Sequence, residues 1–160
     1  MRVVENTPDE GSPSMRMRGK AFHNHLAAQV ARDFLRAGFG VRAEYGLRLP
    51  DGRTDFVDLL AGREGATIAC EVETTARHVL ENMAKAQALR LTLWVVVPNR
   101  QIWSAVVRKV RKIHRTPSAV PIQILLVGEV SYRLTRCFPS FSAANTGPEN
   151  GKTIPERERP

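Results

Sequence analysis

The segment 68–74 carries two carboxylates that could bind a metal ion. Its sequence, Ile-Ala-Cys-Glu-Val-Glu-Thr, predicts a buried strand, and because side chains alternate along a strand, Glu71 and Glu73 share one face. Two charges on a buried strand face need compensation, which a divalent cation supplies. Asp55, sixteen residues before Glu71, offers a third carboxylate from the preceding predicted strand. The sequence therefore predicts a Mg²⁺ or Mn²⁺ site formed by Asp55, Glu71 and Glu73.

A series of helices and strands must position these carboxylates. Phe22, Leu26, Val30 and Phe34 recur every four residues, which predicts an amphipathic helix that ends near Gly38. The remaining predicted elements are strands over 41–49, 53–60 and 66–73, a helix over 76–89, a strand over 91–97, a helix over 100–114 and a strand over 121–127. The order α-β-β-β-α-β-α-β predicts one α/β domain over 19–137, with a mixed central sheet flanked by helices.

The two ends of the chain differ from this domain in composition. Residues 1–18 and 138–160 contain Pro, Gly and Ser without apolar periodicity, which predicts a flexible N-terminal arm and a disordered C-terminal tail. No apolar run approaches the roughly 18 residues of a membrane span, and the start lacks the apolar stretch of a secretory signal. Cys70 and Cys137 are too few for a disulfide framework. We expect a cytoplasmic protein without a membrane segment.

The net charge of +8 is concentrated in one stretch of the chain. Between Asn82 and Gly128 there is no acidic residue, and the eight cations there equal the whole net charge: Lys85, Arg90, Arg100, Arg108, Lys109, Arg111, Lys112 and Arg115. An acidic cluster with a separate basic surface is typical of a metal-dependent enzyme that acts on a polyanion. Arg108, Arg111, Lys112 and Arg115 share a helix face and are the predicted phosphate contacts. The alternative is a solvated basic face without a specific partner.

The acidic motif and the element order together resemble the PD-(D/E)xK nuclease superfamily, which has the restriction-endonuclease-like fold. The resemblance covers about residues 19–127. Segment 54–57, Thr-Asp-Phe-Val, stands where the superfamily has Pro-Asp followed by apolar residues, and Glu71-Val72-Glu73 stands where it has Glu-x-Lys. Segment 19–26 is similar to the first-helix segment of archaeal junction resolvases, with His23 where those proteins usually have Glu. The resemblance implies an αβββαβ core, here with an extra helix and strand, and Mg²⁺-dependent hydrolysis of DNA.

In that chemistry Asp55 and Glu71 would be the main Mg²⁺ ligands, and the motif lysine would position the attacking water. Glu73 occupies the lysine position here, although some members of the superfamily carry Glu there and some recruit a polar residue from the next helix. Gln87 falls on the sheet-facing side of the helical wheel and resembles the helix glutamine of several members. Lys85 falls on a different side, but it is the only nearby cation that could replace the lysine. We rank Gln87 above Lys85; an ordinary surface or packing role remains open for both.

Three further residues carry two interpretations each. Asp58 has opposite parity to Asp55, which predicts that it faces the other side of the sheet and makes a buried hydrogen bond or ion pair. His23 lies on the apolar stripe of its helix, so it would either point at the site or be a hydrogen-bonded core histidine. Trp103 would either stack a base or pack in the core, and core packing is favoured.

Two functions from different classes therefore remain open. The first is a Mg²⁺-dependent DNA nuclease. The second is a catalytically degenerate nuclease-fold module that binds nucleic acid or a partner without cleaving, and a scaffold subunit is a third interpretation by fold analogy alone. No target-recognition domain is recognisable in the sequence, so loops, a partner, a homodimer or a larger complex would supply specificity.

Overall fold

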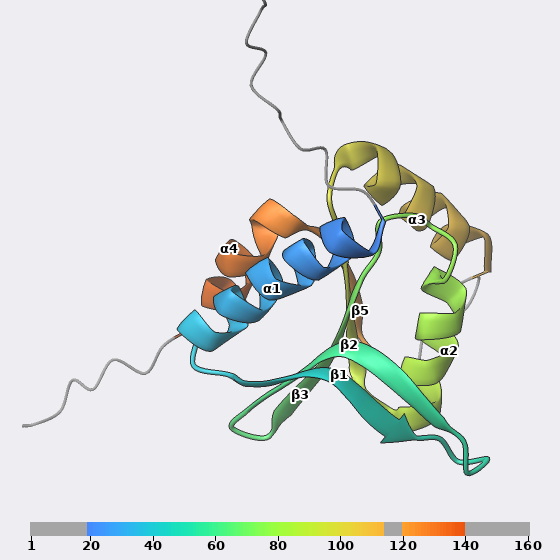
Figure 1. Ribbon diagram of the computed structural model, residues 1–160, viewed down its shortest axis with the longest axis horizontal. Coiled ribbons are helices and arrows are strands. Elements are labelled where there is room, and N and C mark those ends of the chain that lie inside the picture. The colour runs from blue at the N-terminus through green and yellow to red at the C-terminus, as the bar shows by residue number, and fades with distance from the viewer. Residues whose placement is uncertain (1–18, 114–119, 140–160) are drawn as a thin grey trace, which may run out of the picture.

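The computed structural model describes residues 19–113 and 120–139 (Figure 1). The elements are α1 (Lys20–Arg36), β1 (Gly40–Arg48), β2 (Thr54–Arg63), β3 (Ala66–Val72), α2 (Val79–Leu89), β4 (Thr92–Val97), α3 (Arg100–Ile113), β5 (Ile122–Leu126), the 3-10 turn η1 (Val127–Glu129) and α4 (Val130–Cys137). The predicted order of the first eight elements is confirmed, and α4 is an addition. The predicted arm over 1–18 lies outside the described residues, as does the predicted tail beyond residue 139. Across the described ranges, no helix combines the length and apolar character needed to cross a membrane.

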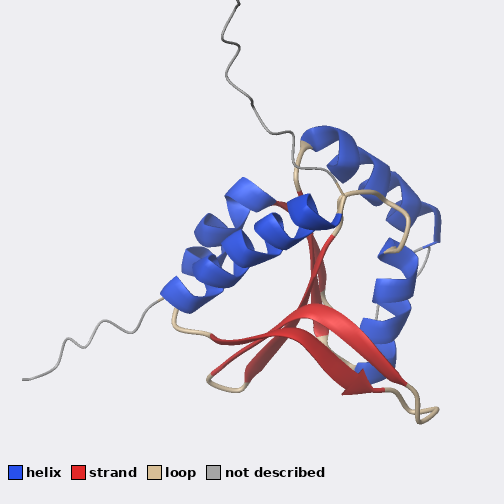
Figure 2. Cartoon of the chain, viewed as in Figure 1, coloured by secondary structure: helices blue, strands red, loops and turns tan. Residues whose placement is uncertain are grey.

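The five strands form one mixed sheet in the order β1-β2-β3-β4-β5. The first three strands pair antiparallel, and β3, β4 and β5 pair parallel. Helices α1 and α4 cover one face of the sheet, and α2 and α3 cover the other (Figures 1 and 2). The chain is therefore an α/β protein with a five-stranded mixed sheet and four helices in its described part.

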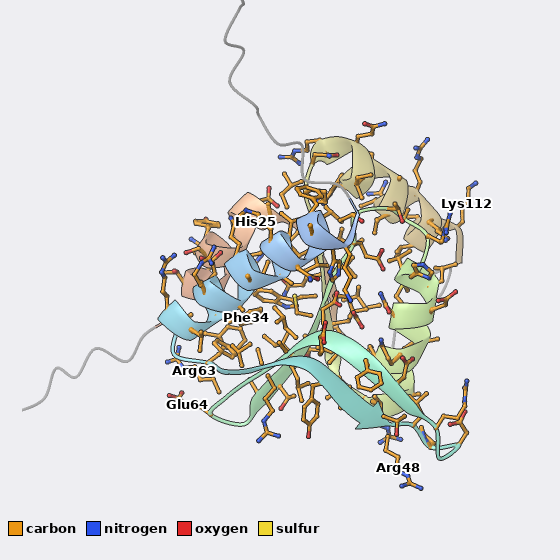
Figure 3. All side chains as sticks on the ribbon, in the orientation of Figure 1. His25, Phe34, Arg48, Arg63, Glu64 and Lys112 are labelled. Atoms are coloured by element: carbon orange, nitrogen blue, oxygen red, sulfur yellow. The ribbon has the colours of Figure 1, made fainter. Side chains whose placement is uncertain are left out.

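The layer beneath α1 is held by the apolar stripe found in the sequence. Leu26, Val30 and Phe34 are buried, and Phe34 points from α1 toward the sheet (Figure 3), with its ring 5.4 Å from that of Trp94. The helix ends at Arg36, and Gly38, two residues later, has a φ of 82° that suits glycine, while the N–H of Phe39 donates to the carbonyl of Phe34 at 3.0 Å.

Helix α4 extends this same layer. Val130 and Leu134 are buried in it, and the ring of Phe138 packs edge-on against Phe39 at 5.0 Å. Arg63 donates to the carbonyls of Ala37 and Phe138, which ties the ends of α1 and α4 to the β2–β3 turn. The packed chain therefore continues through Phe138, one residue past the predicted end of the domain.

The opposite layer packs α2 and α3 on the sheet. Val79, Met83 and Ala86 of α2 contact the apolar run of β4, which is buried on both faces as its sequence predicts. Trp103 belongs to this layer, and its indole N–H donates to the carbonyl of Ile124 at 3.2 Å. The core-packing interpretation of Trp103 is confirmed.

The β1–β2 hairpin changes face part-way along its length. Leu59 and Ala61 pack in the α1 layer, yet Val57, which has the same parity, packs in the α2 layer. The change occurs at Glu44, which has a φ of 46° and interrupts the β1–β2 ladder, and at Asp58, which lies opposite Glu44. A non-glycine residue at positive φ is uncommon in a strand and redirects the side chains beyond it.

Strand β2 also separates from β3 at this point. Their pairing runs from Arg63↔Ala66 only as far as Leu59↔Cys70, whereas β3 stays paired with β4 up to a hydrogen bond from Glu73 N to Val96 O of 2.8 Å. The separation leaves space at the carboxyl end of β3, between the first turn of α1 and helix α2.

Candidate active site

An open pocket of about 530 Å³ occupies this space, within the range of roughly 300–1,000 Å³ seen for ligand sites. The charged residues that line it are Asp55, Asp58, Glu71, Glu73, Glu81, Arg77 and Lys85, joined by His23 and His78. Five acidic groups against two basic ones make the pocket acidic, although the whole chain carries a net charge of +8. Such a pocket attracts cations and repels a phosphate unless cations are bound.

The predicted alternation along β3 is confirmed. Ile68, Cys70 and Val72 pack in the α1 layer, while Glu71 and Glu73 face the side of α2. Both glutamates are buried, with 4% and 6% of their surface exposed. Because buried carboxylates need partners, the residues that α2 directs at them decide the chemistry of the pocket.

Lys85 is the partner of Glu71. Its Nζ lies 2.7 Å from Glu71 Oε1, donates to the carbonyl oxygen of Phe56 and lies 4.0 Å from Asp55 Oδ1. Only 7% of the Lys85 side chain is exposed. Glu71 Oε1 is buried and has this ion-pair contact but no well-directed hydrogen bond. A single ammonium group therefore joins α2 to both acidic strands.

The ranking of Gln87 above Lys85 is wrong. Helix α2 lies on the sheet along Val79, Met83, Lys85 and Ala86, and this orientation leaves Gln87 exposed and outside the residues that line the pocket. The helical wheel favours Gln87 because it ranks faces by apolar content alone. Pairing with Glu71 is what makes burial of the Lys85 ammonium tolerable.

Asp58 lines the pocket together with Asp55 and Glu71. Its Oδ2 accepts a hydrogen bond from Val72 N at 2.7 Å and lies 3.1 Å from Nε2 of His23. Its own N–H donates to Glu71 Oε2 at 3.3 Å. The predicted hydrogen bond or ion pair is therefore found, although it is only partly buried, and the carboxylate contacts α1 while Asp55 lies near Lys85 of α2.

His23 points at the site, one of its two predicted orientations, whereas His25 is exposed on the outer side of α1 (Figure 3). Burial alone would lower the pKa of His23, but the charge of Asp58 and hydrogen bonds to Asn24 and Asp58 outweigh it, so the pKa lies above its usual value. The histidine is thus held as a donor to Asp58. No metal-ligand spacing in the sequence identifies this pair.

Asp55 and Glu73 occupy the edges of the pocket. The Asp55 side chain is 53% exposed, and its Oδ1 accepts from the N–H of Phe56 at 2.8 Å. Glu73 Oε1 accepts from Nδ2 of Asn82 at 2.8 Å, a contact that the sequence does not suggest. Among the described residues, no three His, Cys, Asp or Glu side chains are grouped so that they could hold a metal ion together. The structure therefore brings Asp55, Glu71 and Glu73 into one pocket but not into the predicted three-ligand cluster.

A Mg²⁺ ion does not require three protein ligands. It commonly takes one or two carboxylates and keeps several waters. Asp58 and Glu71 lie on neighbouring strands, linked by the Asp58 N–H···Oε2 hydrogen bond, and Glu71 Oε1 lacks a well-directed donor. Carboxylate oxygens are ligands that a hydrated Mg²⁺ ion accepts, so Asp58 and Glu71 could hold one. Asp55, at the pocket mouth, could contact the same ion through a water molecule.

Burial sets the protonation of the two glutamates. It raises the pKa of Glu71 to about 7, against the opposing effect of Lys85. Burial also raises the pKa of Glu73, opposed by His78 and His23. The ionised pocket is therefore destabilised in the absence of a bound cation.

This predicts a pH-dependent stability without metal. The pKa of Glu71 in the folded protein exceeds its usual value of 4.5, so protonation of Glu71 stabilises the folded state relative to the unfolded state. This stabilisation is fully present below pH 4.5 and is lost as pH rises through about 7. The loss is on the order of 3 kcal/mol. Urea unfolding in EDTA at pH 5 and pH 8.5 should show the difference in the wild type but much less of it in Glu71→Gln, because the group that titrates is then absent. An equal pH dependence in both proteins would assign it to other groups.

Comparisons with known proteins assign no family to the chain. No family model matches it, and no curated protein matches it. A solved structure described as AF1548, a protein of unknown function, is similar with a TM-score of 0.42 and 11% sequence identity. The match covers 63% of this chain and 57% of AF1548.

Proposed function

We propose that this chain is a Mg²⁺-dependent nuclease of the PD-(D/E)xK type that hydrolyses phosphodiester bonds in DNA. The observation that carries the proposal is the acidic pocket at the carboxyl end of β3, in which Asp58 and Glu71 meet the buried ammonium of Lys85. Carboxylates beside one buried cation supply the two requirements of phosphodiester hydrolysis, a metal site and a fixed positive charge.

Each residue of the pocket has its own part in this chemistry. Asp58 and Glu71 would hold Mg²⁺, and the bound ion supplies charge neutralisation on the phosphate and activation of a water. His23 and the N–H of Val72 fix the Asp58 carboxylate. The nuclease motif has a lysine where this chain has Glu73, and Lys85 of α2 supplies the missing positive charge. Glu71 and the Phe56 carbonyl hold the Lys85 ammonium in place.

Helix α3 is the proposed phosphate-binding surface. Arg108, Arg111 and Lys112 are exposed on it, and Figure 3 shows Lys112 projecting outward at its carboxyl-terminal end. Arg115 lies outside the described residues. Lys109 is used differently, because its Nζ donates to the carbonyls of Ala76 and Arg77 at 2.8 and 2.7 Å and so fixes the loop that borders the pocket.

Replacing Arg108 and Arg111 together by Ala should weaken binding to all DNA sequences alike. If both contact phosphates, the slope of log K against log salt should fall by roughly 0.9 per lost contact on duplex DNA. Anisotropy titrations at several salt concentrations measure this. The matched control removes the same charge from α4, through Arg133→Ala with Arg136→Ala, both exposed and on the other face of the sheet. Equal slopes in both double variants would place the polyanion elsewhere.

A second candidate is a degenerate nuclease fold that binds nucleic acid or a partner without cleaving. The absence of a three-ligand group among the described residues favours it, as does an ammonium group 2.7 Å from Glu71 Oε1. In that case the Glu71–Lys85 pair is purely structural and no cation is needed in the pocket.

Metal titration separates the two candidates. Mn²⁺ binding, followed by electron paramagnetic resonance, should show saturable binding to the wild-type chain, displaced by Mg²⁺ and lost in Asp58→Asn. The matched control is Asp33→Asn, because Asp33 is a partly buried carboxylate of α1 that pairs with Arg36 away from the pocket, and this variant should bind Mn²⁺ normally. A wild-type chain that binds no Mn²⁺, with or without DNA, would support the degenerate module.

A further inference from the structure

The segment 74–78, between Glu73 and helix α2, borders the acidic pocket. It is a series of bends without helix or strand, and four of its five residues line the pocket: Thr74, Thr75, Arg77 and His78. Bends lack the repeating backbone hydrogen bonds of a helix or a sheet, so other contacts must hold them in one conformation. The contacts that fix this segment therefore decide the shape of the pocket on its side.

One side chain of α3 binds the middle of the segment. Lys109 Nζ donates to the carbonyl oxygens of Ala76 and Arg77 at 2.8 and 2.7 Å. In Figure 1 the segment passes beside α3 before α2 begins. The N–H of Arg77 donates to Thr75 Oγ1 at 3.2 Å, so the backbone of Arg77 is bound on both sides. An ammonium group that donates to two successive carbonyls holds a bend more strongly than one neutral hydrogen bond does.

Helix α3 is a rigid support for this contact. Val106 is fully buried against the sheet, and the indole N–H of Trp103 donates to the carbonyl of Ile124 at 3.2 Å. Arg108, next in sequence to Lys109, is exposed and belongs to the proposed phosphate-binding surface. The same helix therefore carries the phosphate contacts and the anchor of the segment 74–78.

Lys109 differs from the other cations of α3 in its surroundings. It is half-buried, whereas Arg108, Arg111 and Lys112 are exposed. A lysine that only binds phosphate would leave its ammonium group in solvent, ready for the polyanion. The ammonium of Lys109 is instead directed at backbone carbonyls of the pocket border.

We infer that Lys109 is a positioning residue, which holds the segment 74–78 on α3 and so fixes this border of the pocket relative to the phosphate-binding surface. The inference rests on the proposed function. DNA bound along α3 then meets the metal site in one geometry, without any contact to Lys109 itself. This matters for the rate because a misplacement of reacting groups by about 1 Å can cost roughly 100-fold.

The kinetic test compares Lys109→Met with Lys109→Arg, which keeps donors for both carbonyls. Lys109→Met should lower kcat on DNA by about 10- to 100-fold with little change in KM, and Lys109→Arg should regain most of the loss. Anisotropy titrations with Ca²⁺ in place of Mg²⁺ should give Lys109→Met the same slope of log K against log salt as the wild type, because no phosphate contact is lost. Thermal unfolding confirms that each variant is folded, and Lys109→Gln takes the place of Lys109→Met if the latter is not.

Limited digestion with trypsin reports on the segment itself and needs no nuclease activity. Trypsin cleaves after Arg77, within the segment, and mass spectrometry of the fragments identifies this cut. The cut should be at least about fivefold faster in Lys109→Met than in the wild type, and slow in Lys109→Arg. Lys112→Met, which removes the same charge from the same helix, is the matched control. It should lower the salt slope by roughly 0.9 and leave the cut after Arg77 slow.

The outcomes separate this inference from the proposed function. A lower kcat in Lys109→Met together with a faster cut after Arg77 supports the inference. If Lys109→Met instead loses salt slope as Lys112→Met does, and the cut stays slow, Lys109 is a phosphate contact and the inference is overturned while the nuclease proposal stands. The same holds if Lys109→Met cleaves DNA as fast as the wild type. If the wild type cleaves no DNA, the nuclease proposal fails and the positioning role in cleavage fails with it.

Discussion

Replacing Lys85 by Met is expected to destabilise the fold at pH 8 by about 3 kcal/mol, because it leaves the Glu71 carboxylate buried without its cation. At pH 5 the difference should shrink, since Glu71, with a pKa raised to about 7 by burial, is then protonated in the folded protein. The same change should reduce cleavage by about 100-fold or more, because a fixed positive charge at the reacting phosphate is lost. Urea unfolding at both pH values and a cleavage assay measure the two effects.

The matched control is Lys112→Met, which removes an exposed cation from α3. It should leave the free energy of unfolding nearly unchanged. If Lys85→Met were as stable as Lys112→Met at pH 8, the Glu71–Lys85 ion pair would not hold α2 to the acidic strands. A Lys85→Met protein that is destabilised yet cleaves normally would exclude the ammonium from catalysis.

Asp58→Asn is expected to abolish Mn²⁺ binding and to lower cleavage by more than about 100-fold, while the protein stays folded. Loss of a residue that merely supports a metal ligand costs roughly 10- to 100-fold, and Asp58 is proposed to contact the ion directly. The Asn side chain can still accept the hydrogen bond from Val72 N, so the local backbone should be preserved. Metal titration, cleavage kinetics and thermal unfolding give the three readouts.

Comparison with Asp55→Asn identifies the main ligand. Asp55 is 53% exposed at the pocket mouth, so its neutralisation should reduce cleavage less than Asp58→Asn while leaving DNA binding intact. If Asp55→Asn lost all metal binding and Asp58→Asn lost none, the assignment of Asp58 as the central ligand would be wrong and Asp55 would replace it.

Much of the fold could be predicted from periodicity and parity. The stripe of α1, the buried run of β4 and the alternation of Glu71 and Glu73 against Val72 all depend on regular geometry, which the sequence displays directly. Helix α2 begins at Val79, three residues after its predicted start, and the intervening loop is fixed by Lys109, a long-range contact with no local signal.

Parity fails where the strand is irregular. It does not predict that Asp58 lines one pocket with Asp55 and Glu71, because Glu44 adopts positive φ and the hairpin changes face there. A different signal is present in the sequence. The tight turn at Glu64-Gly65 pairs Arg63 with Ala66, and counting back along this register places Asp58 opposite Glu71. Two acidic residues that face each other across a hairpin indicate a shared site more directly than the alternation of side chains within one strand does.

The inward orientation of Lys85 and Asn82 could not be predicted, for another reason. A helical wheel ranks faces by apolar content, whereas these two polar side chains turn inward because buried carboxylates on β3 require donors. Only knowledge that α2 crosses the carboxyl end of β3 could have indicated this. Tertiary arrangement, and not local pattern, therefore determines which residues of α2 meet the site.

The most direct measurement is a cleavage assay with the purified chain on labelled single-stranded, duplex and branched DNA, in Mg²⁺, in Mn²⁺ and in EDTA, beside Asp58→Asn and Asp33→Asn. The metal-dependent nuclease predicts products in Mg²⁺ or Mn²⁺ from the wild type and Asp33→Asn, none in EDTA, and none from Asp58→Asn at the same protein concentration. Absence of cleavage on every substrate with both metals, or cleavage that persists in EDTA or in Asp58→Asn, would contradict the account.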